Sequence, residues 1–393
     1  MTQGGQPREH HWDALRAFLM LLGIPYHVAL TYQVGEGQMW IVNAHEGVAG
    51  FTEIAAFLHI FRMPAFFAIA GYFAALLLAR RTPGEWMRGR MRRLAIPFVV
   101  ALLTLNPLLN LACELSNFSL DAAARSWVLN SSKSGGYWIR HLWFLIVLLY
   151  YCAIAAALVG WFPALAGRQL SPERDGSWAR HFTLFWFIVA VLVGVWEAAS
   201  IEFFYMAGLA TNIPQQILRF DEAFQYVPFF ALGFFVARTT DIKGRLYRPS
   251  PVIVVAAVVF TGLAMLYAKG LWPPYGRFLK TIAAIMLMQP LFLVVRHVFS
   301  QQSRLINRIV DASFVIYLFH MPILTWLVVL FLPVAMPALL KACIVMMLTL
   351  GLSWLAWEVV VRSRLLRLLY DGVQISGNRS SAGQNRTPKL VRS

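Results

Sequence analysis

The sequence predicts an all-α polytopic integral membrane protein, a bundle of about ten transmembrane helices with both termini in the cytoplasm. Three observations support this prediction. Only 13% of the 393 residues are charged, about half the usual share of roughly 25% in soluble domains. Apolar runs of about 20 residues, the length that crosses a bilayer, recur along the whole chain. Basic residues gather in alternate loops, as they do on the cytoplasmic side of membrane proteins.

The apolar segments predict the spans in order along the chain. They are rich in Leu, Ala, Phe and Trp and are too long for the strands of a barrel, which alternate over about ten residues. The sixth segment is short, and the second is long enough to tilt. The ten predicted spans are residues 13–34, 51–79, 94–113, 138–160, 182–203, 223–238, 251–268, 277–296, 309–332 and 337–361.

The distribution of Lys and Arg sets the orientation of these spans. The N-terminal segment, the loops after even-numbered spans and the C-terminal segment together hold 24 of the 34 basic residues. The loops on the other side hold only Arg125, Lys133, Arg219, Lys269 and Arg277. The net charge of +16 therefore follows from topology and attraction to anionic lipid. It does not require a nucleic-acid partner.

The chain divides into one long apolar part and a short polar end. We expect residues 1–370 to form one transmembrane domain and residues 371–393, rich in Gly, Ser, Asn and Arg, to form a disordered basic cytoplasmic tail. Cys113, Cys152 and Cys343 stand singly in apolar surroundings without metal-ligand spacing, so no metal site is expected. We find no internal repeat of the kind that many transporters contain.

Ionisable residues inside spans are costly and mark functional sites by default. Arg16 and His27 are eleven residues apart, which leaves a net rotation of about 20° and a separation of about 16 Å along one helix face. Asp13 lies three residues before Arg16 and joins that face. Gly23 leaves a groove between Arg16 and His27. This face therefore marks two ends of a path, from the cytoplasmic surface to a point beyond mid-membrane.

Other spans carry further ionisable residues. His59 and Arg62 are spaced i,i+3 in the second span, and His141 and His320 fall at middle or outer depth. These residues fit either a polar pocket or simple hydrogen bonds between helices, and Asp13 with Arg16 fits an interfacial ion pair equally well. Four more are expected to form structural pairs: Glu197, Lys280, Asp311 and Glu358.

Several stretches resemble a known family. RAFLMLLGIPYH resembles the Arg-x10-His motif of the membrane-bound acyltransferase 3 family, and MRGRMRRLAIPF resembles its Arg-x-x-Arg element, here Arg90 and Arg93. Spans one, two, four and nine more narrowly resemble the glucans biosynthesis protein C branch of that family. The stretches that carry this resemblance are DALRAFLMLLGIPYHVAL, FRMPAFFAIAGYF, HLWFLIVLLYY and ASFVIYLFHMP.

The resemblance implies a multi-pass enzyme of the inner membrane that moves an acyl group from cytoplasmic acyl-CoA to hydroxyls of a periplasmic glycan. In the named branch the donor is succinyl-CoA, a co-substrate rather than a bound cofactor, and the acceptor is a periplasmic glucan. The expected partners are the lipid bilayer, acyl-CoA, the glucan and the glucan-synthesis machinery. Two alternatives remain open: an O-acetyltransferase of another envelope glycan, and a transporter or flippase for an anionic glycan or lipid.

The residues divide into roles under this hypothesis. His27 is the expected general base, because neutral imidazole accepts a proton near pH 7. Guanidinium groups bind phosphate well, so Arg16, Arg90 and Arg93 are expected to hold CoA. Whether an acyl-histidine intermediate forms is left open. Contacts to the substrate or the transition state are assigned to Asp13, His59, Arg62, His141 and His320.

The topology can be tested with reporter fusions. Fusions after Arg93 and after Arg248 should give cytoplasmic signals, and fusions within 114–136 and 204–222 should give periplasmic signals, because Lys and Arg are retained inside. A periplasmic signal from the basic loop at 80–93 would reverse the orientation.

Overall fold

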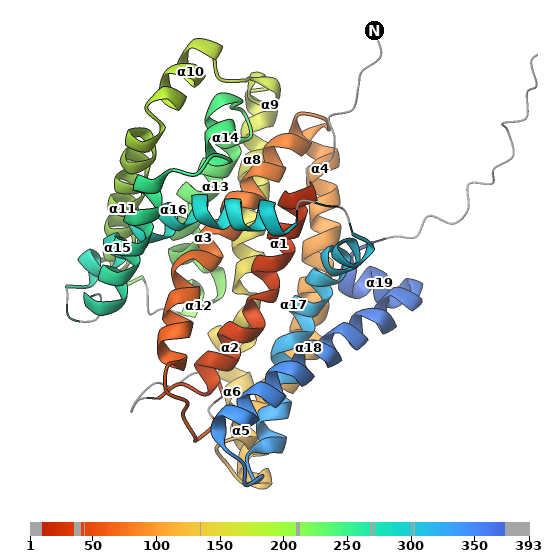
Figure 1. Cartoon of the computed structure of the whole chain (residues 1–393). Coiled ribbons are helices and arrows are strands. Elements are labelled where there is room, and N and C mark those ends of the chain that lie inside the picture. The colour runs from red at the N-terminus through yellow and green to blue at the C-terminus, as the bar shows by residue number, and fades with distance from the viewer. Residues whose placement is uncertain are drawn as a thin grey trace, which may run out of the picture.

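The computed structural model describes residues 10–34, 41–42, 44–133, 135–209, 213–267, 270, 272–299, 301 and 303–373. Every regular element within these ranges is helical. Figure 1 shows the long helices running roughly alongside one another as a bundle. The all-α polytopic fold is therefore confirmed.

Eight helical stretches are long and apolar enough to cross a membrane. The other two predicted spans also form helices, but each has 17 residues and rises only about 26 Å, near the lower limit for a span. These two are α13 (Phe220–Val236) and α15 (Pro251–Tyr267). The eight are α1–α2 (His10–Leu21 and Gly23–Thr31), α3 (Phe51–Leu78), α4–η1–α5 (Pro83–Leu115), α7–η2–α8 (Gly136–Trp161), α11 (Phe182–Met206), α16 (Pro273–Val298), α17 (Arg304–Phe331) and α18 (Ala338–Arg362).

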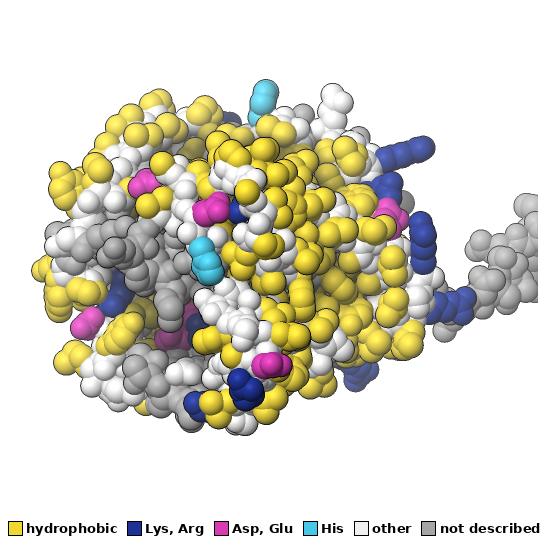
Figure 2. Space-filling view, turned by 90° about the horizontal axis from the view of Figure 1, so that it is seen from below, with side chains coloured by type: hydrophobic (Ala, Val, Ile, Leu, Met, Phe, Trp, Pro, Cys, Tyr) yellow, Lys and Arg dark blue, Asp and Glu magenta, His cyan; other side chains and the backbone are white. Residues whose placement is uncertain are grey.

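Shorter helices cover the two ends of the bundle. Figure 1 shows α4, α10 and α14 at one end and α6 at the other. We call the first the basic end, because its loops hold most of the Lys and Arg residues, and the second the opposite end. Figure 2 shows the molecule from the opposite end, with hydrophobic side chains over much of that face and Lys, Arg, Asp and Glu scattered among them. The short helices are α4 (Pro83–Arg90), α6 (Leu120–Lys133), α9 (Ala164–Gly167), α10 (Pro172–Arg180), α12 (Ile213–Leu218), α14 (Asp241–Leu246) and α19 (Arg364–Asp371).

A buried carboxylate fixes the basic end. Asp175 of α10 is 4% exposed and accepts hydrogen bonds from the backbone N–H groups of Thr240, Asp241 and Ile242, at 2.6, 2.9 and 3.0 Å. These donors lie at the N-terminus of α14, where the helix leaves N–H groups without helical partners. One side chain thus joins two short helices that connect different spans.

The predicted boundary between domain and tail falls inside α19, which continues to Asp371. Gly372 and Val373 follow in contact with the bundle, because Gly372 approaches the backbone of Arg92 and Arg93. The remaining predicted tail, 374–393, lies outside the described residues, so its disorder stays a prediction.

Helices α3 and α13 cross at two glycines. A Cβ added to Gly71 would stand 1.9 Å from the carbonyl oxygen of Phe230, and one added to Gly233 would stand 1.7 Å from that of Ala68. Small residues at such crossings let membrane helices approach closely, because van der Waals packing, not hydrophobicity, drives association in lipid. This crossing sets the position of α3, which carries His59 and Arg62, relative to α13.

Replacing Gly71 or Gly233 with Ala should destabilise the fold, because either methyl group overlaps a backbone carbonyl that cannot move without separating the helices. A lower thermal unfolding temperature of detergent-solubilised protein would show this. Gly351→Ala in α18 is the matched control, because no atom lies within 4 Å of its added Cβ. Ala is favoured over Gly within a helix by about 1 kcal/mol. If all three variants have the wild-type unfolding temperature, the crossing does not depend on the glycines.

Candidate functional site

A cluster of three histidines and an arginine lies inside the bundle. His27 of α2 and His320 of α17 have ring centroids 5.3 Å apart, and His141 lies 5.6 Å from His320. All three imidazoles are buried, with at most 6% exposure. Arg62 of α3 adds a cation whose Cζ lies 4.5 Å from the ring centroid of Tyr26. Four helical segments that are distant in sequence therefore contribute to one polar centre.

The hydrogen bond of His320 defines which ring nitrogen faces the cluster. His320 Nδ1 lies 2.6 Å from the carbonyl oxygen of Tyr317, which can only accept, so Nδ1 carries the proton. In the neutral ring Nε2 is then an acceptor. A Cβ on Gly23 would stand 3.5 Å from this Nε2 and 3.5 Å from a terminal nitrogen of Arg62. The backbone of α2 therefore lies close to both groups at Gly23, one helical turn before His27.

The turn that carries His141 is held by asparagines of α5. Arg140 has a positive φ of 47°, an uncommon conformation for a residue with a side chain. Its Nε donates to Asn110 Oδ1 at 2.7 Å. Asn110 and Asn106 in turn donate to the carbonyl oxygens of Tyr137 and Ile139. Backbone outside a regular helix is tolerated at membrane depth only where such partners satisfy it.

The arginine cavity opens toward the basic end, where Arg16 and Met20 precede Gly23 and His27 on one helix. Its volume is about 450 Å³. Three of its arginines are Arg16, Arg90 and Arg93, which the sequence predicted to act together. Apolar side chains line part of the wall. The lining residues are Arg16, Met20, Phe66, Arg90, Arg93, Leu94, Phe144, Leu148, Val310, Asp311, Ser313, Phe314, Trp357, Val361, Arg367, Asp371 and Val373.

Two local features shape the arginine cavity. Between α4 and α5 lies a single π-helical turn, η1 (Met91–Ala95), which follows Arg90 and contains Arg93, and such turns are frequent at functional sites. On the other side, Gly372 ends α19 in a left-handed conformation, φ 64°, against the carbonyl of Arg92. That contact places Asp371 at the cavity wall, where burial raises the pKa of its carboxyl group and Arg367 opposes the rise.

The mixed-charge cavity lies at the opposite end. It is formed by the C-terminal part of α11 and the N-terminal parts of α13 and α16, which all lie away from the basic end. Its volume is about 230 Å³. His59, whose Nδ1 is 3.2 Å from the hydroxyl oxygen of Tyr26, lies on its wall next to the central cluster. The lining residues are His59, Ile60, Pro64, Glu197, Ile201, Phe204, Tyr205, Asp221, Gln225, Tyr226, Arg277, Lys280, Thr281 and Ala284.

The structure brings most of the predicted site residues together, but not all. Asp13 pairs with Arg16 at 3.7 Å and lines neither cavity. Glu358 forms the expected structural ion pair, with Arg308. Glu197 also has structural partners, since it accepts hydrogen bonds from Gln225 and Thr281, and it lines the mixed-charge cavity. Lys280 lines the same cavity and Asp311 lines the arginine cavity, and their structural pairing stays a prediction.

Sequence reasoning missed several residues at these sites. Tyr26 precedes His27 and contacts both Arg62 and His59, but a tyrosine within an apolar span gives no distinct signal. Arg367 and Asp371 are spaced i,i+4 on α19, 3.7 Å apart, in a segment taken for the domain end. Their spacing on a short amphipathic helix was the only available signal.

This arrangement is suited to group transfer between two separate compartments. The arginine cavity offers four guanidinium groups against two carboxyl groups and so favours an anionic ligand. The central imidazoles can accept and donate protons, and Arg62 can stabilise negative charge. The mixed-charge cavity lies next to this centre, with His59 of its wall in contact with Tyr26.

Comparison with known proteins agrees with this geometry. The acyltransferase 3 family, described as an acyltransferase domain, matches residues 9–358. Glucans biosynthesis protein C of Salmonella typhimurium is 30% identical over 390 residues, covering 95% of this chain and 97% of that protein. The protein of the same name from Salmonella gallinarum is 29% identical over 387 residues, with the same coverage.

No solved structure matches this chain. The family match nevertheless spans nearly the whole chain and includes the central cluster and all but the last residues of the arginine cavity. The chain therefore belongs to the acyltransferase 3 family and is a multi-pass membrane acyltransferase.

Proposed function

We propose that this protein is an O-acyltransferase of the inner membrane that moves a succinyl group from cytoplasmic acyl-CoA to hydroxyls of a periplasmic glucan. One observation carries the proposal: α3 lines both cavities, with His59 in one and Phe66 in the other, and Arg62 lies on α3 between these two residues, close to His320. A donor and an acceptor that never share a compartment need this arrangement. The printed names of the relatives support a glucan acceptor.

The arginine cavity has the chemistry of a donor site. Coenzyme A carries several phosphate groups at one end and a long, thin pantetheine arm at the other. Arg16, Arg90 and Arg93 offer planar, permanently charged donors for the phosphates. Apolar residues such as Met20 and Phe66 line the same cavity toward the centre and suit the arm. The thioester would then lie toward Gly23, which follows Arg16 and Met20 along the chain.

His27 is the proposed general base. The sugar hydroxyl loses its proton to His27, and its oxygen forms a bond to the thioester carbonyl carbon. The carbon–sulfur bond then breaks, and the thiolate of CoA takes the proton from His27. His320 Nε2 and the guanidinium of Arg62 both lie close to Gly23, and the guanidinium would stabilise the negative charge that develops on the carbonyl oxygen.

The surroundings of Arg62 are a second argument for a succinyl donor, whose acyl group carries a free carboxylate. Among the described residues no carboxylate lies within ion-pair distance of its guanidinium, which instead makes a cation–π contact with the ring of Tyr26. A cation inside a membrane bundle is normally paired. The free carboxylate of a succinyl group would complete such a pair, whereas an acetyl group would not.

His27→Gln should abolish transfer, because an amide can form hydrogen bonds but cannot accept the proton. General bases contribute about 10²–10⁴-fold, so we expect a loss of that order in transfer from succinyl-CoA to glucan, measured with purified protein. Binding of succinyl-CoA should persist. His297→Gln, an exposed histidine near the C-terminus of α16, is the control. If the transfer rate of His27→Gln stays within tenfold of the wild-type rate, the general base is another residue.

Joint replacement of Arg90 and Arg93 with Ala should weaken binding of succinyl-CoA by about tenfold or more, because hydrogen bonds between charged groups contribute about 1.5–3 kcal/mol. Isothermal titration with purified protein measures this directly. The control is the pair Arg80→Ala and Arg81→Ala in the same basic segment, which lines neither cavity. Equal binding by both double variants would reduce Arg90 and Arg93 to a topological role. Failure of the wild type to bind succinyl-CoA would favour a flippase.

A further inference from the structure

The mixed-charge cavity contains a buried carboxylate that retains capacity for further hydrogen bonds. Glu197 of α11 is 8% exposed. One of its oxygens accepts from Gln225 Nε2 at 2.7 Å, and the other accepts from the hydroxyl group of Thr281. A carboxylate has about four acceptor positions. Glu197 can therefore accept hydrogen bonds from a ligand while α11, α13 and α16 hold it in place.

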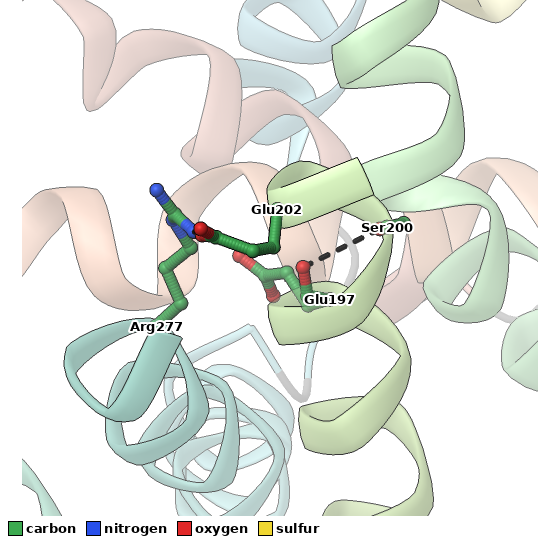
Figure 3. Close-up of polar contacts among 4 residues, drawn as sticks. All are labelled: Glu197, Ser200, Glu202 and Arg277. Carbon is green, nitrogen blue, oxygen red and sulfur yellow. Dashed lines mark hydrogen bonds and ion pairs between the residues drawn. The ribbon is translucent and has the colours of Figure 1, made fainter. Parts of the chain in front are cut away.

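A second acidic residue lies near the outer part of this cavity. Glu202 is five residues after Glu197 on the same helix, and its Oε2 lies 3.1 Å from a terminal nitrogen of Arg277. Figure 3 shows Arg277 of α16 directed toward Glu202, with Glu197 close by. Arg277 is thus already paired, and its charge is neutralised where it borders the cavity.

The two cavities differ in the ratio of acidic to basic side chains that line them. The mixed-charge cavity is lined by two carboxyl groups, Glu197 and Asp221, and by two cations, Arg277 and Lys280. The arginine cavity has four arginines and two aspartates. Complementarity of charge selects partners by repelling the wrong ones. An anion is therefore favoured at the basic end, and a neutral ligand rich in hydrogen-bonding groups is favoured at the opposite end.

The cavity also has the right position relative to the reacting centre. His59 lies on its wall and contacts the hydroxyl group of Tyr26 at 3.2 Å. The Tyr26 ring lies 4.9 Å from the ring of His27. The contact between His59 and Tyr26 therefore separates the cavity from His27. A ligand group that displaces this contact enters the space beside the proposed base.

We propose that the mixed-charge cavity is the acceptor subsite and binds one neutral sugar ring, with Glu197 and Gln225 as its hydrogen-bond partners. This inference rests on the proposed function. It adds where the acceptor binds, and the charge and size of the acceptor group that the cavity holds. The volume of about 230 Å³ is below the roughly 300–1,000 Å³ of sites for drug-sized ligands. It therefore suits a single ring, and the remainder of a glucan would lie outside the cavity.

Two variants test the subsite. Glu197→Gln replaces one acceptor oxygen with a donor group, and Gln225→Leu removes the amide while leaving the carboxylate. Each should raise the KM for glucan, and the KM for a methyl β-glucoside used as a minimal acceptor, by about tenfold or more, since a hydrogen bond to a charged group is worth about 1.5–3 kcal/mol. The affinity for succinyl-CoA should stay at the wild-type value.

Glu114→Gln is the matched control. Glu114 is also 8% exposed and accepts hydrogen bonds from Ser126, Asn130 and Tyr137, but it lies outside both cavities. It should leave both KM values unchanged. If transfer proceeds and Glu197→Gln and Gln225→Leu both keep the wild-type acceptor KM, the subsite is disproved while the proposed function stands. If the wild type transfers nothing to any glucan or glucoside, the proposed function itself fails.

Competition tests the preference for a neutral ligand. Methyl β-glucoside should compete with glucan for transfer by the wild type, and glucuronate, which adds one negative charge to the ring, should compete at least tenfold less well. Stronger inhibition by glucuronate that is competitive with glucan would overturn the neutral subsite. In Glu197→Gln, which lacks the repelling charge, the difference in inhibition between methyl β-glucoside and glucuronate should be smaller than in the wild type.

Discussion

The central constraint in this protein is the placement of a guanidinium cation inside an apolar bundle. Arg62 lies on α3 with its Cζ 4.5 Å from the Tyr26 ring centroid. A cation over an aromatic face gains roughly 2 kcal/mol when it is desolvated, far less than the cost of an isolated charge in a low-dielectric medium. The surrounding helices must therefore supply polar groups, and the imidazoles of His27 and His320 are gathered at the same place.

Close helix packing makes this centre possible. Gly71 and Gly233 let α3 and α13 approach until their backbones touch, and Gly23 lets α2 pass beside Arg62 and His320. A larger residue at Gly71 or Gly233 would overlap a backbone carbonyl and separate α3 from α13. Small residues thus bring the backbones together, while buried polar atoms of the centre, such as Arg62 Nε and His320 Nε2, form no hydrogen bond with any described residue.

The two ends of the bundle have different electrostatic characters, and in our proposal this difference gives the reaction a direction. Arg90 and Arg93 lie where topology already concentrates positive charge. A phosphate-bearing donor therefore meets a field of the right sign on one side only. At the other end, the carboxylate of Glu197 discourages the same ligand. The segregation of Lys and Arg that orients the chain during insertion also separates the donor from the acceptor in our proposal.

The sequence alone determined the class of protein, the order of its helices and three of the arginines that line the arginine cavity. Apolar length and periodicity are local properties, so each of the eight helical stretches long enough to cross a membrane falls on a predicted span, and the other two predicted spans form helices of 17 residues. Arg16 and His27, expected on one helix face, lie on the consecutive helices α1 and α2. The tertiary structure decided everything that depends on contact between distant segments. It placed Glu197 and Lys280 in a cavity, brought Arg367 and Asp371 to the arginine cavity and set His320 beside His27. The physical reason is that lipid gives helices no sequence-visible preference for particular neighbours. Packing of small residues and satisfaction of buried polar groups select those neighbours, and both depend on the whole bundle.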